Sequence, residues 1–191
     1  LLAYFNHINL IDPILACAVV PREMVPLSKE ENMSLPIVGA IARAYGVIPV
    51  RRGELDTLAF KRSLAVLAQE DVLLVAPEGT RSGHGRLQAA KDGVTMMALR
   101  AGAPLVPIAV TGQDAFRTCF RRLRKTRVAI WIGRPFRFIA TQGARIPRSE
   151  ITAMTTEAMR ELAALLPAPN RGAYAEGIDE PRQWIVYESG S

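Results

Sequence analysis

The stretch of sequence that decides the fold is Val72-Leu73-Leu74-Val75-Ala76-Pro77-Glu78-Gly79-Thr80-Arg81. Its first five residues are apolar, and a continuous run of this kind is typical of a strand that is covered on both faces of a sheet. The proline and glycine that follow predict a turn, and that turn is polar. The sequence therefore predicts a buried strand that ends in a charged loop.

Similar apolar runs and helical patterns alternate along the rest of the chain. Further strands are predicted at 1–5, 24–27, 47–50, 105–110 and 128–132, of which the first and the last two are expected to be buried. Helices are predicted, from apolar spacing and from flanking capping residues, at 13–20, 35–45, 58–69, 91–101 and 149–166. Strands that alternate with helices predict an α/β sandwich with a mostly parallel, possibly mixed central sheet.

The chain has 191 residues and shows neither an internal repeat nor a linker, so we predict one domain. Residues 1–166 form its main body. Residues 167–191 are rich in proline, glycine and charge, and are expected to lie on the surface as a tail of the same domain.

The net charge of +6 indicates an anionic partner, which is a nucleic acid, an acidic lipid surface or a phosphorylated substrate. Charge alone does not choose among these. Cys17 and Cys119 lie far apart in the sequence and indicate neither a disulfide framework nor a zinc site. No signal peptide or membrane-spanning run is present, but the sequence starts at Leu1 without a methionine, so a membrane anchor upstream stays open.

A histidine precedes an aspartate by five residues in Asn6-His7-Ile8-Asn9-Leu10-Ile11-Asp12. If His7 lies in a loop and Asp12 in the first turn of the helix at 13–20, the carboxylate can orient the imidazole as a general base. Two plainer interpretations stay open. His7 can be an ordinary histidine at a strand end, and Asp12 can serve as the helix N-cap.

The loop 77–82 contains the donors that an anion site needs. Gly79 allows close approach of the backbone, Arg81 offers a planar fork of donors to a phosphate, and Thr80 adds a neutral donor. Glu78 can accept a hydrogen bond from a hydroxyl group or brace an arginine. The plainer interpretation is a surface turn with a Glu78–Arg81 ion pair.

Two arginines, Arg51 and Arg52, directly follow the strand predicted at 47–50. At a strand end near the other loops they would form a second anion clamp, and otherwise they are solvated. No Gly-x-Ser-x-Gly nucleophile motif and no Walker loop is present.

The segment 116–127 alternates apolar residues with cations. As a helix it would have Phe116, Phe120 and Leu123 on an apolar stripe flanked by arginines and a lysine. This pattern fits a helix on an anionic membrane, and it fits equally an amphipathic helix packed on the domain. Nucleic-acid binding is a third possibility, but no recognised motif accompanies the charge.

The two motifs together, His7-x4-Asp12 followed by Pro77-Glu78-Gly79-Thr80-Arg81, resemble the signatures of bacterial lysophosphatidate acyltransferases (1-acyl-sn-glycerol-3-phosphate acyltransferases). Three weaker similarities follow the same order: Gly46 with Arg52, Lys91-Asp92-Gly93, and Val106-Pro107-Ile108 with Gly112. The chain departs from the family pattern at Asn9, Arg51 and Ala76.

The resemblance implies that residues 1–166 are a catalytic domain that moves a fatty acyl group from acyl-CoA or acyl carrier protein to lysophosphatidate, forming phosphatidate in phospholipid synthesis. His7 and Asp12 would be catalytic. The acceptor would be bound by Arg52, Glu78, Gly79, Thr80 and Arg81, without a metal ion or cofactor.

Two alternatives stay open. The acceptor can be another lysolipid, such as a lyso-aminolipid or glycolipid, or the domain can bind lipid or acyl-CoA without catalysis. The resemblance also implies a peripheral protein on an anionic membrane surface, at the cytoplasmic face, that does not bind nucleic acid.

Overall fold

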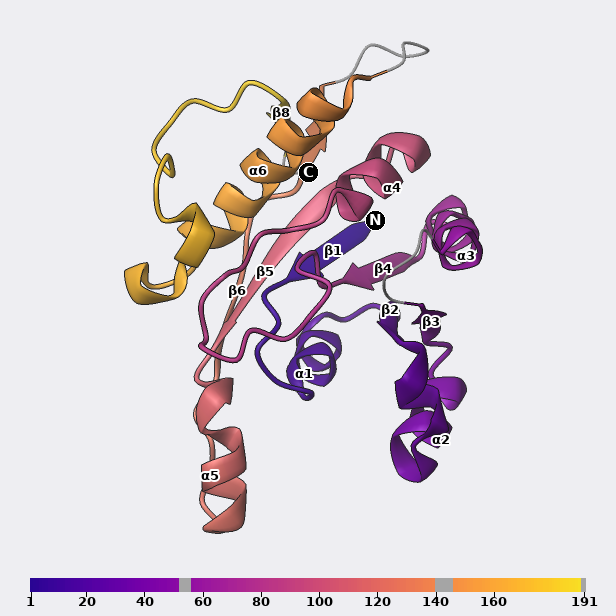
Figure 1. Cartoon of the computed structure of the whole chain (residues 1–191), viewed down its shortest axis with the longest axis vertical. Helices are drawn as coiled ribbons and strands as arrows, with labels where there is room; N and C mark the ends of the chain where they lie inside the picture. The colour runs from indigo at the N-terminus through magenta and orange to yellow at the C-terminus, as the bar shows by residue number, and fades with distance from the viewer. Residues whose placement is uncertain (52–55, 140–145, 190–191) are drawn as a thin grey trace.

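The centre of the molecule is an eight-stranded sheet in the order β3-β2-β4-β1-β5-β7-β8, with β6 also paired to β5 (Figure 1). The structure is a computed structural model, and it describes residues 1–51, 56–139 and 146–189. The strands are β1 (Leu2–Phe5), β2 (Met24–Lys29), β3 (Ile48–Val50), β4 (Val72–Val75), β5 (Leu105–Thr111), β6 (Ala129–Ile132), β7 (Phe136–Phe138) and β8 (Ile185–Tyr187).

Six α-helices and four short 3-10 helices connect these strands in the part of the chain that the structure describes. The α-helices are α1 (Asp12–Val19), α2 (Pro36–Ala44), α3 (Thr57–Ala68), α4 (Gly93–Ala101), α5 (Phe116–Arg121) and α6 (Arg148–Ala164). The 3-10 helices are η1 (Glu30–Ser34), η2 (Gln113–Ala115), η3 (Ala168–Asn170) and η4 (Gly172–Tyr174). Among the described residues, no helix is long and apolar enough to cross a bilayer.

The sheet is mixed, as the sequence predicts. The five strands from β3 to β5 are parallel to their neighbours, whereas β6, β7 and β8 pair in antiparallel fashion. In the parallel part, Tyr4 lies opposite Val75 of β4 and Pro107 of β5. Because parallel strands end at the same edge, the loops after β1 and β4 emerge side by side.

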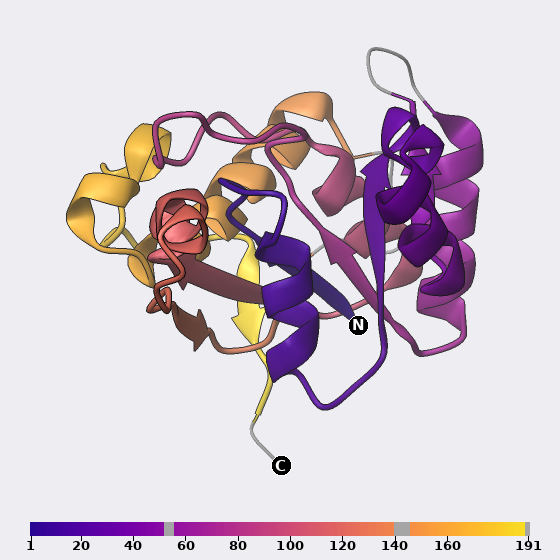
Figure 2. The ribbon, with the colours of Figure 1, turned by 90° about the horizontal axis from the view of Figure 1, so that it is seen from below.

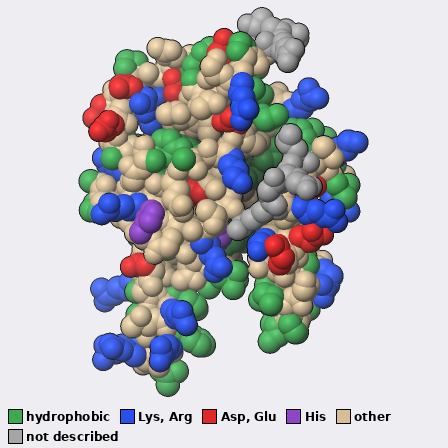
Figure 3. All heavy atoms as spheres, in the orientation of Figure 1, with side chains coloured by type: hydrophobic (Ala, Val, Ile, Leu, Met, Phe, Trp, Pro, Cys, Tyr) green, Lys and Arg blue, Asp and Glu red, His purple; other side chains and the backbone are tan. Residues whose placement is uncertain are grey.

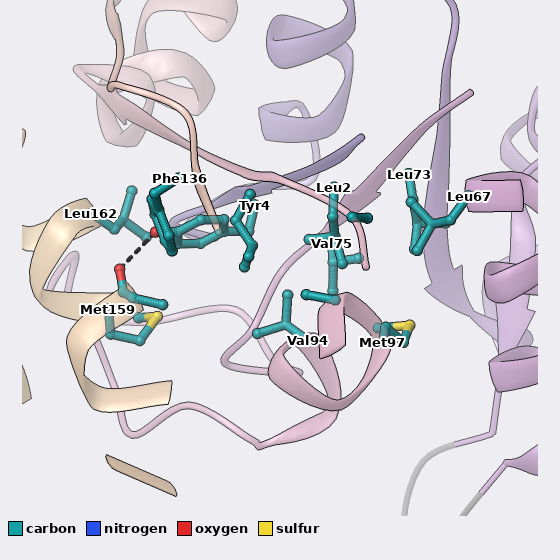
Figure 4. Close-up of a cluster of buried hydrophobic side chains, with 14 of the residues drawn as sticks. Leu2, Tyr4, Leu67, Leu73, Val75, Val94, Met97, Phe136, Met159 and Leu162 are labelled. Carbon is teal, nitrogen blue, oxygen red and sulfur yellow. Dashed lines mark hydrogen bonds between the residues drawn. The ribbon is translucent and has the colours of Figure 1, made fainter. Parts of the chain in front are cut away.

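Strand β1 is buried in the middle of this sheet and its side chains alternate between two cores. Leu2 and Tyr4 join the core beneath α3, α4 and α6, while Ala3 and Phe5 join the core beneath α1. The Tyr4 hydroxyl lies in the first core and donates a 2.7 Å hydrogen bond to the Ala158 carbonyl of α6 (Figure 4). This bond joins the central strand to the longest helix.

Several element boundaries have the local causes that the sequence predicts. Asp56 caps α3 by accepting a hydrogen bond from the Ala59 amide. Gly102 ends α4 in the left-handed region with φ 57°. Pro49 lies in β3, which is an edge strand, where its missing amide hydrogen is tolerated.

Other expectations differ from the structure. The sequence predicts that β6 is buried, but Trp131 and Ile132 are exposed. Among the described strands, β6 pairs with β5 alone, so it forms an edge of the sheet. The segment 116–127, whose apolar stripe requires a helix, is helical only as far as Arg121. The C-terminal segment that the sequence places on the surface also carries β8, which pairs with β7.

Asn6 directly follows β1 and continues the sheet with its side chain. Its amide nitrogen donates to the Val110 carbonyl and its amide oxygen accepts from the Val110 amide, each at 2.8 Å. The Asn6 side chain is buried, so these two bonds replace a pair of backbone bonds at the point where the chain leaves the sheet.

We expect Asn6→Ala to lower the free energy of unfolding by about 2–3 kcal/mol, because it leaves the buried Val110 amide without a partner. Urea denaturation measures the loss. A suitable control is Asn32→Ala, which removes one partly exposed side-chain bond to Ser28 and should cost less than about 1 kcal/mol. Equal losses in the two variants would contradict the structural role of Asn6.

Candidate active site

His7 and Asp12 form a hydrogen-bonded pair at the C-terminal end of β1. The imidazole Nδ1 lies 3.1 Å from Asp12 Oδ2, and the His7 side chain is 14% exposed while that of Asp12 is fully buried. The expectation that the two side chains meet across the junction of loop and helix is confirmed.

One oxygen of Asp12 organises the whole loop between the two residues. Besides the imidazole, Oδ2 accepts hydrogen bonds from the amides of Ile8 at 2.6 Å and Asn9 at 2.7 Å. Because these amides can only donate, Oδ2 is an acceptor, and His7 Nδ1 must carry the proton that it shares with Asp12. The other ring nitrogen, Nε2, is then left with a lone pair that can accept a proton.

Asp12 does not cap α1, contrary to the N-cap interpretation of the sequence. It is the first residue of the helix, the N-cap position belongs to Ile11, and no side chain bonds to the first turn. The carboxylate turns back toward the preceding loop, where it satisfies the Ile8 and Asn9 amides. Pro13 is the second residue of the helix, and its φ suits the first helical turn.

Glu78 ties the loop after β4 to the loop after β1. Its carboxylate is buried and accepts hydrogen bonds from the His7 amide at 3.2 Å and the Gln88 amide at 2.9 Å. Burial raises the pKa of Glu78, although the two amides oppose the shift. Both oxygens are thus engaged with backbone, so the carboxylate positions the two loops and does not pair with Arg81.

The Ser82 amide adds a second link between the same loops, since it donates to the His7 carbonyl at 2.7 Å. The amide and the carbonyl of His7 are therefore both bonded to the motif that lies about seventy residues further along the chain. The loop after β4 and His7 therefore share one edge of the sheet.

Gly79 has the conformation that its place in the motif predicts. Its φ is +66°, and a β-carbon there would lie 3.2 Å from Lys91 Cε. The Lys91 side chain therefore runs past Gly79, and the Lys91 amide donates to the Pro77 carbonyl at 2.9 Å. The sequence indicates Lys91 only through the Lys-x-Gly resemblance, and the structure brings it to the loop.

The remaining loop residues point outward. Thr80 and Arg81 are exposed, and no hydrogen bond or ion pair joins the Arg81 guanidinium to another described residue. An exposed and uncompensated cation in the loop bonded to His7 suits an anionic ligand. Arg52 lies outside the described residues, and its neighbour Arg51 is bonded to Glu30 at 2.9 Å.

A third loop, after β5, is also attached to the site. Asn9 donates through its side chain to the Gln113 carbonyl at 3.2 Å, and the buried Gln113 side chain donates to the Val110 carbonyl at 3.1 Å. These contacts were not predicted. Asparagine and glutamine carry no periodic signal, and their partners are backbone atoms that only the fold brings near.

The site therefore brings together the His7–Asp12 pair, the exposed Arg81 guanidinium and the tight turn at Gly79. Among the described residues, no cluster of three or more His, Cys, Asp or Glu side chains could hold a metal ion. Neither cysteine lies within the hydrogen-bonded network of His7 and Asp12.

Comparison with known proteins gives consistent results. The protein-family model described as "Acyltransferase" matches residues 1–111, which is more than half of the chain. The 1-acyl-sn-glycerol-3-phosphate acyltransferase of Limnanthes alba is 30% identical over 129 residues, covering 65% of this chain and 46% of that protein. The Borreliella burgdorferi protein of the same name is 27% identical over 113 residues, covering 58% and 45%.

The chain thus spans less than half the length of these relatives. A crystal structure of the 1-acyl-sn-glycerophosphate acyltransferase PlsC from Thermotoga maritima has a similar fold. Its TM-score is 0.58 at 23% sequence identity, covering 82% of this chain and 62% of that one. The matched residues contain β1 to β5 and both motifs of the site, and by this match the chain belongs to the acyltransferase family.

Proposed function

We propose that this protein transfers a fatty acyl group from a thioester donor to the hydroxyl group of lysophosphatidate, forming phosphatidate. The hydrogen bond between His7 Nδ1 and Asp12 Oδ2 is the observation that carries the proposal. It leaves Nε2 as the proton acceptor, which is what attack by a hydroxyl group requires. Family membership and the names of the relatives support the same reaction.

The reaction is a direct transfer in which His7 acts twice. Nε2 takes the proton from the acceptor hydroxyl as its oxygen attacks the thioester carbonyl carbon. The carbon–sulfur bond then breaks, the ester remains on the acceptor, and the imidazolium returns its proton to the departing thiolate. Asp12 stabilises the imidazolium through Nδ1 between these two steps. The donor is acyl-CoA or acyl carrier protein, because both present the same thioester.

The acceptor phosphate is held by exposed donors beside the base. Arg81 supplies a planar guanidinium without a partner among the described residues, and Thr80 and the Gly79 turn supply neutral donors. Lys91 adds a second cation that runs along Gly79. Arg52, predicted from sequence, would complete the clamp from the loop after β3. Holding the phosphate orients the hydroxyl group toward Nε2 and so contributes to the rate.

The experiment that tests the function follows release of free thiol from an acyl-CoA by the purified protein. We expect release to depend on lysophosphatidate and to yield phosphatidate. Lysophosphatidylcholine and lyso-aminolipids test the other acceptors. Turnover with one of these in place of lysophosphatidate would reassign the acceptor, and no turnover with any lysolipid would leave a non-catalytic domain.

We expect His7→Ala to lower acyl transfer by about 10²–10⁴-fold, the usual contribution of a positioned base. The other histidine provides the control. His84 is exposed and its Nδ1 accepts a bond from the Arg86 amide, so His84→Ala should retain wild-type turnover. Steady-state thiol release measures both variants, and full activity in His7→Ala would rule out the assigned role.

We expect Arg81→Lys to raise the KM for lysophosphatidate with little change in the KM for the thioester, because lysine keeps the charge but loses the fork. Arg81→Ala should lower kcat as well, since the hydroxyl group is then poorly oriented. Arg86→Ala removes another exposed cation of the same loop and should change neither constant. An effect of Arg81→Ala on the donor alone would reverse the assignment.

The raised pKa of buried Glu78 gives a pH-dependent expectation. Its ordinary value is 4.5, so as pH rises above this value the unfolded chain ionises before the folded one, and stability falls until the folded carboxyl ionises too. Glutamine does not ionise, so Glu78→Gln avoids this loss. We therefore expect the unfolding free energy of Glu78→Gln minus that of wild type to rise as pH increases from 4.5 to the pKa of the folded carboxyl, and to stay constant above it.

Urea denaturation at a series of pH values measures the difference between Glu78→Gln and wild type. Glu176→Gln, at an exposed position, should show no such trend. A difference that falls with rising pH would mean that the backbone amides dominate over burial at Glu78.

A further inference from the structure

One segment stands apart from the body of the molecule. Residues 113–127, which we call the basic arm, lie between the paired strands β5 and β6 and contain η2 and α5. Its two ends meet at a narrow neck, where a β-carbon on Gly112 would lie 2.3 Å from the Arg127 carbonyl oxygen. Helix α5 projects from this neck at one end of the molecule (Figure 1).

The basic arm carries most of the net charge of the protein. It has six cations and one acid, a net charge of +5, where the whole chain has +6. All six cations are exposed, and none has an ion pair with another described residue: Arg117, Arg121, Arg122, Arg124, Lys125 and Arg127. Figure 3 shows lysine and arginine side chains gathered on the projection at the lower left. Nothing within the described structure neutralises this charge.

The arm also exposes apolar side chains among the cations. Phe120 is 69% exposed and Leu123 is 96% exposed. Leu123 has φ 50°, in the left-handed region where glycine normally ends a helix, so this leucine is conformationally unfavourable as well as solvated. Neither burial nor backbone geometry within the described chain explains a leucine at this position.

The neck of the arm is bonded to the catalytic loop. Gln113, the first residue of the arm, accepts a hydrogen bond from Asn9, which lies between His7 and Asp12. Helices α1 and α2 lie at the same end of the molecule as α5, as the views from the side and from below agree (Figures 1 and 2). They expose Ile14 and Ile37, at 64% and 75%.

We propose that the basic arm docks this protein on an anionic lipid surface, with Leu123 and Phe120 entering the interface and the cations contacting lipid phosphates. Charge complementarity selects the partner, since a helix end with exposed apolar residues between arginines suits an anionic bilayer. Helices α1 and α2, at the same end of the molecule, add exposed isoleucines. A nucleic acid would contact the cations but would leave the apolar residues in water.

Docking in this manner brings the catalytic loop to the bilayer. Because Gln113 is bonded to the loop that holds His7, an arm lying on the surface places the base beside lipids in that surface. This second statement rests on the proposed function, whereas the docking itself does not.

Co-sedimentation with vesicles tests the docking. The vesicles are phosphatidylcholine alone or an equimolar mixture with phosphatidylglycerol. We expect binding only to the anionic vesicles and weaker binding at higher salt. Each cation at such a surface contributes about a factor of five, so Arg121→Gln/Arg124→Gln should weaken binding about 25-fold. The matched control, Arg100→Gln/Arg148→Gln, removes two exposed cations on α4 and α6 and should bind like wild type.

A second variant separates docking from folding. Leu123→Gly removes the apolar side chain and relieves the left-handed backbone, so we expect an unchanged or higher Tm together with severalfold weaker vesicle binding. A merely structural leucine would not give this combination. Vesicle binding of Leu123→Gly equal to that of wild type would remove the apolar residue from the interface.

Three results would overturn the docking proposal: equal loss of vesicle binding in the arm and control double variants, salt-independent binding to neutral vesicles, or arm-dependent binding to duplex DNA without binding to anionic vesicles.

A short-chain lysophosphatidate dissolved as monomers separates docking from catalysis. The arm variant should turn it over normally while failing on acceptor in anionic vesicles. If wild type binds the vesicles but acylates neither form, the proposed function fails and the docking stands.

Discussion

The structure depends on one buried carboxylate. Asp12 Oδ2 accepts hydrogen bonds from two backbone amides and from the His7 imidazole, and the residue is completely shielded from solvent. Its other oxygen, Oδ1, has no hydrogen-bond partner among the described residues, so the three contacts of Oδ2 alone offset the cost of burying the carboxylate, and removing any of them affects the others. The same oxygen that closes the loop therefore fixes the ring orientation and tautomer of His7. The loop structure and the tautomer of His7 are two consequences of a single interaction.

Parallel strands bring this loop to its partners, and side chains that replace backbone pairing hold it there. Asn6 continues β1 against Val110 beyond the end of the strand, and Glu78 connects the loops after β1 and β4 through two amides. The Glu78 carboxylate is buried at this junction, and its burial raises its pKa. The result places the His7–Asp12 pair at the edge of the sheet, next to an exposed cation, Arg81.

Much of this arrangement could be predicted from the sequence because it follows from local signals. The apolar run at 72–76, the cap at Asp56 and the turn glycines have causes within a few residues, and the two motifs identify the pair His7–Asp12 and the loop after β4. Contacts between distant segments could not be predicted. The inward orientation of Glu78 depends on the His7 and Gln88 amides, which only the sheet brings together. Likewise, nothing in the alternation of 116–127 indicates that α5 stops at Arg121 and leaves Leu123 in solvent.

The most direct test of this account is the tautomer of His7, measured from its imidazole ¹⁵N chemical shifts by NMR near neutral pH. A carboxylate that accepts from Nδ1 requires a protonated Nδ1 and an Nε2 with a free lone pair, and Asp12→Ala, which removes the acceptor, should abolish the preference for this tautomer. A wild-type ring protonated on Nε2, or an unchanged tautomer preference in Asp12→Ala, would contradict the claim that Asp12 prepares His7 as the base.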